Sequence, residues 1–245
     1  MRLKGKVALV TGGTRGLGRS IAEAYAAEGA SVMVAGRGGD GHPSPVDGVA
    51  DQVAFHAADV RDAASVDALM AATVARFGGL DIVVANAGVS IPGPVSALTP
   101  EQWTDVVTTN LTGVFHCVRS AVPYLEHGDG GRVITMSSVL GSRAVAGAAA
   151  YCATKAAVEA FTRSVALELA PRGITVNCLA PGFIDEGMGR VLRQNEAVWE
   201  RYRGKLALGR MGSADEVARA AVFLAAEDSS YVNGHVLEVN GGLAW

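Results

Sequence analysis

Short apolar runs alternate with helical patterns along the whole chain, and this alternation limits the possible folds more than any other feature. Seven runs rich in β-branched residues begin at Val7, Ser31, Val53, Asp81, Arg132, Ile174 and His235. Continuous apolarity is typical of strands that are buried on both faces of a parallel sheet. Helical patterns lie between the runs, at 16–29, 62–77, 101–127, 149–170 and 213–226. The sequence therefore predicts an α/β fold, a Rossmann-like doubly wound parallel sheet of about seven strands with helices on both faces.

Neither a linker nor an internal repeat interrupts the pattern, so residues 1–245 are predicted to form one domain. The segment 37–52 departs from the pattern, because four glycines and two prolines there predict a loop with little or no helix. Two helix starts carry capping signals. Thr99 precedes a proline, and Ser213 stands three residues before Glu216, as in a capping box.

The composition argues against several kinds of partner. A net charge of -3 and a pI near 6.0 give no electrostatic reason to expect nucleic acid. The sequence contains no uninterrupted run of 18 apolar residues, so no membrane span is predicted. The five histidines lack metal-ligand spacing, so no metal is expected. The three cysteines, Cys117, Cys152 and Cys178, are far apart and odd in number, which predicts reduced thiols and a cytoplasmic location.

A glycine-rich turn, TGGTRGLG at 11–18, follows the first predicted strand and opens the first predicted helix. Gly12, Gly16 and Gly18 allow a sharp turn, a close approach to a pyrophosphate and tight packing of the helix on the sheet. The N-terminus of that helix offers free N–H groups and a positive dipole end to phosphate. The sequence therefore predicts a dinucleotide site.

The end of the second predicted strand indicates which dinucleotide is preferred. An NAD site typically places an acidic residue there for the ribose 2′-hydroxyl, but this chain has Gly36 followed by Arg37. Arg15 in the glycine-rich turn is a second cation near the same position. Two guanidinium groups and no acid favour the 2′-phosphate of NADP(H). The alternatives are that both arginines are merely solvated, and that NAD(H) is used, since Gly36 does not exclude it.

The stretch YCATK places Tyr151 and Lys155 four positions apart on a predicted helix, with only small residues between them. Residues at this spacing lie on one face of a helix. A tyrosine and a lysine so placed can be an ordinary surface pair, and only the rest of the chain favours a catalytic role.

Several motifs in order along the chain resemble the short-chain dehydrogenase/reductase family in its single-domain form, over nearly the whole length. The matching residues are Thr11, Gly12, Gly16 and Gly18; Asp59 and Val60; Asn86, Ala87 and Gly88; Asn110 in TTNLTGVF; Ser138, thirteen residues before Tyr151; Tyr151 and Lys155; and APGFIDEGM at 180–188. Ala85 stands where the family has the first Asn of NNAG, and Glu186 stands where it usually has a Thr that contacts the cofactor.

The resemblance implies roles for these residues. The catalytic set would be Asn110, Ser138, Tyr151 and Lys155. The cofactor would contact Gly12, Thr14, Arg15, Gly16, Leu17, Gly18, Arg37, Asp59, Val60, Asn86, Ala87, Gly88, Tyr151, Lys155, Pro181, Gly182 and Ile184. The substrate would contact Ser138, Leu140, Val145, Tyr151 and Phe183, under a lid at about 183–210. Tyr151 would be the acid or base. Lys155, together with the positive charge of the oxidised nicotinamide, would favour its phenolate and would also hold the nicotinamide ribose. Asn110 would hold a water.

The substrate class is less constrained. LGRMG at 208–212, VNGG at 239–242, Arg132 and Arg172 are similar to 3-oxoacyl-carrier-protein reductases, whose carrier-contacting arginines the last two match. Ala148 and Ala150 replace a Gln and an Asn usual in that group. Two roles are possible for Arg143: its side chain contacts an anionic or polar substrate, or it is simply solvated.

We therefore expect an NADP-preferring oxidoreductase that interconverts a small-molecule carbonyl and a secondary alcohol, with 3-oxoacyl thioesters as candidate substrates. The alternatives are an NAD-dependent alcohol dehydrogenase of the same fold and a non-catalytic dinucleotide-binding regulator. The resemblance also implies a homotetramer in which the helices at 101–127 and 149–170 pair across subunits. Apolar residues on more than one face of the second helix agree with this pairing.

Overall fold

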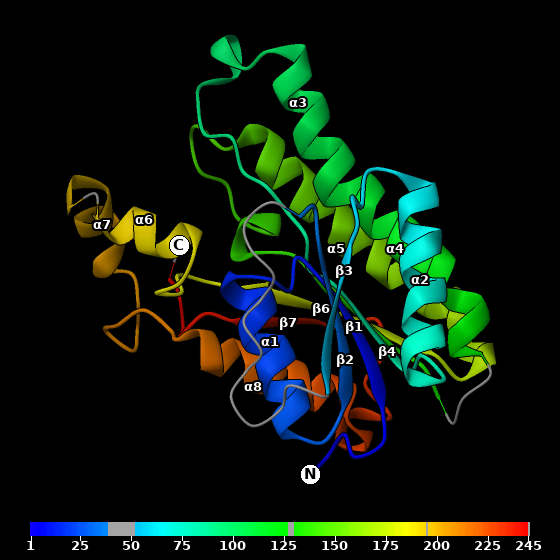
Figure 1. The fold of residues 1–245 in the computed structure, drawn as a ribbon. Coiled ribbons are helices and arrows are strands. Elements are labelled where there is room, and N and C mark those ends of the chain that lie inside the picture. Colours follow the sequence, from blue (N-terminus) through cyan, green and yellow to red (C-terminus); the bar gives the residue numbers. More distant parts are fainter. Residues whose placement is uncertain (39–51, 127–129, 195, 245) are drawn as a thin grey trace.

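The computed structural model describes residues 1–38, 52–126, 130–194 and 196–244, and its centre is one parallel sheet (Figure 1). The sheet has seven strands in the order β3-β2-β1-β4-β5-β6-β7. The strands are β1 (Val7–Thr11), β2 (Ser31–Gly36), β3 (Val53–Ala57), β4 (Ile82–Ala85), β5 (Arg132–Met136), β6 (Thr175–Pro181) and β7 (Val236–Val239). All the strand pairs are parallel, so the predicted sheet is confirmed.

Helices cover both faces of the sheet (Figure 1). One face carries α1 (Gly16–Ala27) and α8 (Ala214–Ala225), which pack on each other, and the other carries α2 (Ala63–Phe77), α4 (Gly113–Leu125) and α5 (Ala149–Leu169). Each layer has its own apolar core, because the strands are buried on both sides. The doubly wound fold is therefore confirmed. The strand order reverses between β1 and β4, where folds of this kind bind ligands beyond the carboxyl ends of the strands.

Two predicted helix starts are confirmed by their caps. Ser213 accepts a hydrogen bond from the Glu216 N–H while the Glu216 side chain accepts one from the Ser213 N–H. Thr99 forms the same capping box with Gln102 at the start of α3 (Pro100–Val107). Each side chain satisfies an N–H group that the first helical turn leaves unpaired.

The predicted helix at 101–127 is interrupted. A π-helical turn, η2 (Thr108–Thr112), separates α3 from α4. The side chain of Asn110, at its centre, accepts from the Val89 N–H at 2.8 Å and donates to the Val89 carbonyl at 2.9 Å. A bulge of this kind re-aims a side chain and is frequent at functional sites. Residues 127–129 lie outside the described residues, as does 39–51, most of the predicted loop.

Shorter elements complete the described chain. They are the 3₁₀ turns η1 (Val95–Ala97), η3 (Val139–Gly141), η4 (Ala170–Arg172) and η5 (Glu227–Ser229), and the helices α6 (Met188–Gln194) and α7 (Glu196–Arg203). The last two follow β6 and stand apart from the layered part of the molecule (Figure 1). In the described ranges, none of the helices combines the length and apolarity that crossing a membrane requires.

Candidate active site

The glycine-rich turn between β1 and α1 forms a cradle that leaves no room for a side chain at Gly12 or Gly18. A Cβ at Gly18 would lie 2.2 Å from the Gly12 carbonyl oxygen, and one at Gly12 would lie 3.0 Å from the Ala87 Cα. Gly12 and Gly16 also have φ of +64° and +58°, which favour glycine. The turn is held by Asn86, which donates to the carbonyls of Thr11 at 2.9 Å and Gly12 at 3.2 Å.

The residues of this turn fit a dinucleotide. α1 begins at Gly16 with no acidic residue in its first turn, so its N–H groups and positive dipole end remain suitable for a pyrophosphate. Gly36 packs against the Thr14 side chain, because a Cβ there would lie 3.2 Å from the Thr14 Cγ2. The end of β2 is thereby placed against the glycine-rich turn, and the exposed Arg37 follows it directly.

Asp59 and Val60 follow β3 on the same edge of the sheet. The Asp59 carboxylate accepts from the Arg61 guanidinium at 3.0 Å and 2.6 Å. These hydrogen bonds hold the pKa of the Asp59 carboxyl below its usual range, and the charge of Arg37 acts in the same direction. Val60 is buried, and its carbonyl lies 2.9 Å from the Nδ1 of His116.

The four predicted catalytic residues come from three parts of the chain, which are η2, the end of β5 and α5, and they lie near one another. Asn110 is fully buried in η2, and its amide also donates to the Thr154 hydroxyl on α5 at 3.2 Å. The Lys155 Nζ lies 5.5 Å from the centre of the Tyr151 ring. A Cβ at Gly88 would lie 3.3 Å from the Asn110 Oδ1 and 3.7 Å from the Lys155 Nζ. The segment after β4 therefore meets η2 and α5 at one point.

Ser138 completes the group from the end of β5. It caps η3, where its hydroxyl accepts from the Leu140 N–H at 3.2 Å. Its hydroxyl also interacts with the Tyr151 phenol and lowers the phenol's pKa. Burial raises the pKa of Tyr151 by more than Ser138 lowers it, so the net direction is upward. Among the protein's own groups, removal of the phenolate from water outweighs the nearby interactions. The lowering expected from Lys155 together with an oxidised nicotinamide stays a prediction.

Burial also governs Lys155. Its side chain is almost fully buried, at 4% exposed, and its Nζ donates to the Met136 carbonyl at 2.7 Å. Desolvation of the ammonium lowers its pKa from 10.5 to about 8. The site thus combines a phenol that keeps its proton at neutral pH with a lysine whose pKa lies close to neutral pH.

Comparison with known proteins identifies the family. The family model described as Enoyl-(Acyl carrier protein) reductase matches residues 12–244. The 3-oxoacyl-(acyl-carrier-protein) reductases FabG of Vibrio cholerae and Escherichia coli K12 are each 38% identical over 243 residues, 99% of this chain and 99% of theirs. The chain belongs to the short-chain dehydrogenase/reductase family. A solved structure from Sinorhizobium meliloti 1021, described as a short-chain alcohol dehydrogenase, matches with a TM-score of 0.89 and 32% identity, covering 98% of this chain and 96% of that one.

Membership of the short-chain dehydrogenase/reductase family makes this protein an NAD(P)-dependent oxidoreductase that acts on carbonyl or hydroxyl groups. The family resemblance seen in the sequence is therefore confirmed. The structure adds that Pro181, the last residue of β6, and Ile184, which follows the strand, are both buried, so that any contact of Ile184 with a cofactor would involve its backbone. Gly182 allows a close approach, since a Cβ there would lie 2.7 Å from the Asn240 Cβ.

Two of the predicted substrate residues, Leu140 and Phe183, lie near the aromatic residues of α7. Leu140, Phe183 and Trp199 are half-buried and pack against a small apolar cluster of Val139, Leu206 and Leu243. The Phe183 ring lies 4.9 Å from the Tyr202 ring, centre to centre. Sequence reasoning missed Trp199 and Tyr202, although their spacing of three residues on a helix places them on one face. Val145 is half-buried in the loop before α5.

Charged residues near the predicted substrate end and lid are paired within the chain. Arg143, left open between substrate and solvent, lies 2.7 Å from the Glu238 carboxylate of β7. Glu186 lies 2.7 Å from the Arg190 guanidinium on α6, so the residue in place of the family's Thr serves an ion pair inside the predicted lid. The sequence left Arg143 either to a substrate or to solvent, but its charge is instead paired with the carboxylate of Glu238, 95 residues away.

The two arginines that resemble carrier-protein contacts are also engaged. Arg132 is buried and its Nη2 lies 3.0 Å from Glu227, while its Nη1 donates to the carbonyls of Gly130 and Gly131. Arg172 pairs with Glu126. In the described structure both guanidinium groups support the fold around the ends of β5 and α5.

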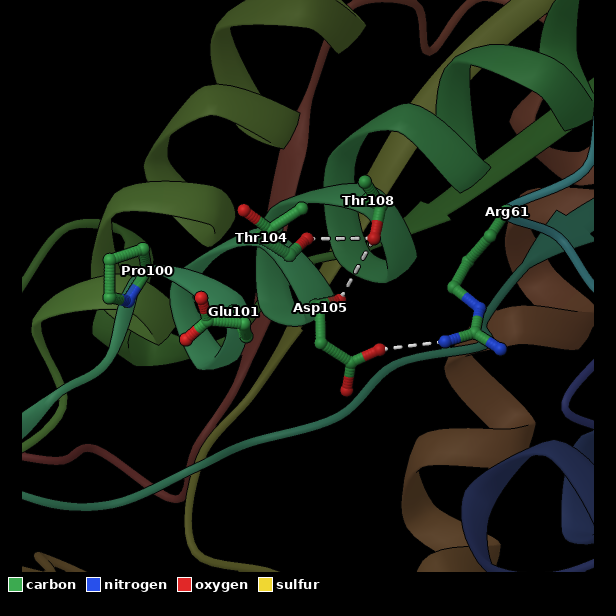
Figure 2. Close-up of a pocket in the computed structure, with 6 residues that line it drawn as sticks. All are labelled: Arg61, Pro100, Glu101, Thr104, Asp105 and Thr108. Atoms are coloured by element: carbon green, nitrogen blue, oxygen red, sulfur yellow. Dashed lines mark hydrogen bonds and ion pairs between the residues drawn. The ribbon is translucent and has the colours of Figure 1, made fainter.

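A separate hollow of about 350 Å³ lies beside α3 (Figure 2). Arg61 reaches the Asp105 carboxylate at 2.8 Å, and the Thr108 hydroxyl donates to the Thr104 carbonyl at 2.7 Å. None of its lining residues belongs to the predicted catalytic, cofactor or substrate sets. Because Arg61 is shared by Asp59 and Asp105, the hollow offers no unpaired cation to an anion.

The depressed pKa of Lys155 predicts a pH-dependent stability. The unfolded chain keeps the lysine protonated up to its usual 10.5, whereas the folded chain releases the proton near 8. The cost of burying the ammonium is thus fully present below pH 8 and fades as the pH rises to 10.5. Lys155→Met should therefore be more stable than wild type at neutral pH by about 2 kcal/mol, after allowance for the lost hydrogen bond.

Denaturant unfolding of both proteins at neutral and alkaline pH checks this prediction. The stability difference should shrink as the pH rises, because wild type loses its penalty and the variant has none. A variant that is less stable at neutral pH, by a margin that does not change with pH, would show that the buried ammonium is not penalised.

Proposed function

We propose that this protein is a reductase that prefers NADP(H) and interconverts a carbonyl and a secondary alcohol at Tyr151. The observation that carries the proposal is the convergence of Tyr151, Lys155, Ser138 and Asn110 beside Gly88, at the strand ends next to the glycine-rich cradle. A protein that only bound a dinucleotide would not need this set. The predicted catalytic and cofactor residues stay proposals in these roles.

The chain's own residues account for the proton transfer. When bound, the nicotinamide dinucleotide supplies a hydride to the carbonyl carbon, or accepts one in the reverse direction. Tyr151 gives its phenol proton to the carbonyl oxygen as the alcohol O–H forms, and takes it back in oxidation. Ser138 donates a hydrogen bond to the same oxygen and orients it. The raised pKa of Tyr151 keeps the phenol protonated at neutral pH, which suits reduction.

Lys155 and Asn110 support that step. Lys155 holds a ribose hydroxyl of the cofactor and, with a pKa of about 8, can return a proton to the phenolate that reduction leaves. Both N–H bonds of the Asn110 amide are used, by the Val89 carbonyl and the Thr154 hydroxyl. Among the described residues, its Oδ1 accepts one hydrogen bond, from the Val89 N–H. A second acceptor site on Oδ1 is therefore available for the predicted water.

The NADP preference rests on charge at the end of β2. Gly36 supplies no carboxylate for a ribose hydroxyl, and the exposed Arg37 follows it beside the glycine-rich turn that carries Arg15. Guanidinium groups bind phosphate with charge-assisted hydrogen bonds. NAD(H) is the second candidate, because a glycine at this position does not repel it.

The substrate class favoured by the curated relatives is a 3-oxoacyl thioester, since FabG is described as acting on that group. The buried Arg132 gives no support for a carrier protein as the partner. We therefore propose a small acyl thioester or ketone that meets Leu140, Phe183 and the α7 aromatics. We also propose one domain over 1–245, a lid at about 183–210 and a cytoplasmic location, the last resting on the three unpaired cysteines.

A substrate panel tests the proposal. Purified protein is given acetoacetyl-CoA, acetoacetyl-carrier protein and a series of ketones of increasing apolar size, with NADPH and with NADH, and oxidation of the cofactor is followed by absorbance. Turnover of the CoA thioester at a rate close to that of the carrier thioester supports a small-molecule substrate. Turnover of the carrier thioester alone would overturn that choice, and no turnover of any carbonyl would overturn the proposed function.

The oligomer is proposed as a tetramer through α4 and α5. Phe115 on α4 is 45% exposed and Leu167 on α5 is 77% exposed, so apolar side chains face outward on both helices. Alanines 153, 156 and 160 on the exposed side of α5 would let another helix approach closely. Light scattering that gives a monomer mass at micromolar concentration would contradict the tetramer.

A further inference from the structure

Glu159 on α5 is a buried carboxylate that the proposed chemistry does not use. It is 5% exposed, and in the described ranges of the chain the other aspartates and glutamates all reach solvent more than it does. Burying a carboxylate is unfavourable unless it is paired and hydrogen-bonded. Its cationic neighbour is the largely exposed Arg163, at 3.4 Å. The shorter contact is with the Ser137 hydroxyl, which donates to its Oε1 at 2.9 Å.

The loop that carries Ser138 is built around this carboxylate. Ser137 lies 22 residues from Glu159 in sequence, and its hydroxyl also reaches the Lys155 carbonyl at 3.1 Å. At the other end of the loop, a Cβ at Gly141 would lie 2.2 Å from the Glu159 Oε1. The chain from Ser137 to Gly141 therefore passes over the carboxylate, and a side chain at Gly141 would force the Glu159 carboxylate to move.

This arrangement connects the two halves of the proposed catalytic site. Ser138 itself makes a local hydrogen bond, to the Leu140 N–H within its own turn. Its contact with α5 is the interaction with the Tyr151 phenol itself. Its neighbour Ser137 adds a second tie to α5, through Glu159, which lies one helical turn beyond Lys155. The loop that carries the Ser138 hydroxyl is therefore held to the helix of the phenol by contacts with Glu159 at both of its ends.

We propose that Glu159 is a positioning residue that fixes the Ser138 loop relative to Tyr151 and Lys155 through the Ser137 hydroxyl and the close packing of Gly141. This inference rests on the proposed function, because it concerns the geometry of the same site. Reacting groups need to be held closely, since a displacement of about 1 Å can cost on the order of a hundredfold in rate.

The test compares Glu159→Ala with Glu159→Gln and with Glu168→Ala. Glu168 is a matched control on the same helix, exposed, whose carboxylate also accepts from a serine hydroxyl, that of Ser164 at 3.4 Å. Glu159→Ala should lower kcat by about ten- to a hundredfold, while the Kd of the cofactor stays within about threefold. Glu159→Gln keeps an acceptor for Ser137 and should lie within about threefold of wild type, as Glu168→Ala should.

A second arm separates positioning from a general loss of stability. In single-turnover measurements, Glu159→Ala should lower the rate much less in a Ser138→Ala background than in wild type, because its effect acts through Ser138. Equal losses in both backgrounds, or a loss of cofactor binding as large as the loss of kcat, would overturn the inference. If Glu159→Ala does not fold, Ser137→Ala removes the same tie with little change in volume and should show the same dependence on Ser138.

The proposed function and this inference fail in different ways. If Ser138→Ala and Tyr151→Phe turn over substrate as fast as wild type, the proposed site is wrong whatever Glu159 does. If those variants are impaired and Glu159→Ala matches wild type in kcat, the site stands and the positioning role of Glu159 is refuted.

Discussion

Replacing Tyr151 with phenylalanine should lower kcat by at least about a hundredfold, because the phenol is the proposed general acid and such groups contribute on the order of 10²–10⁴. The ring stays, so packing on α5 and the position of Lys155, 5.5 Å from its centre, should change little. The Kd of the cofactor, measured by fluorescence titration, should remain within about twofold of wild type.

The matched control is Tyr231→Phe, since Tyr231 is fully exposed after η5 and belongs to none of the proposed sets. It should leave kcat unchanged. The pH profile adds a second check. Because burial raises the pKa of Tyr151, the reductive rate should not need a deprotonated tyrosine at neutral pH, whereas the oxidative rate should rise with pH. If Tyr151→Phe retained more than about a third of wild-type turnover, the phenol would not be the acid.

The fold was accessible from sequence because its signals are local. Strands buried on both faces show as continuous apolar runs, and helix starts show as capping residues such as Thr99 and Ser213. The glycine-rich turn was equally readable, since only glycine tolerates the φ of Gly12 and the contact at Gly18. The parallel order of the strands then brings the residues after β1, β2, β3 and β4 to one edge without further information.

What the sequence did not predict depends on contacts between distant segments. The π-helical turn in the predicted 101–127 helix is accompanied by the pairing of Asn110 with Val89 and Thr154. Arg143 meets Glu238 across 95 residues, and Ser137 meets Glu159 across 22. No local pattern encodes these partners. The rise in the pKa of Tyr151 was missed for the same reason, since burial of a phenol depends on the whole site.

The second large effect is expected for the choice of cofactor. Arg37→Asp removes a favourable charge-assisted contact and places a carboxylate at the end of β2, where it repels a 2′-phosphate and accepts from a ribose hydroxyl. Lost pairing and added repulsion together should lower the affinity for NADPH by on the order of a hundredfold. The affinity for NADH should rise or stay unchanged. The measurement is the ratio of kcat/KM for NADPH to that for NADH.

Charge elsewhere on the surface must be separated from this local effect. Arg219→Asp makes the same change of charge on the exposed face of α8, where Arg219 pairs with Asp215, and should leave the ratio unchanged. Arg15→Ala should move the ratio towards NADH less than Arg37→Asp does, because it removes attraction without adding repulsion. All variants are compared at one salt concentration, since exposed charges are screened. A wild type that already prefers NADH, or an Arg37→Asp variant with an unchanged ratio, would show that these arginines do not bind a phosphate, and the NADP preference would be wrong.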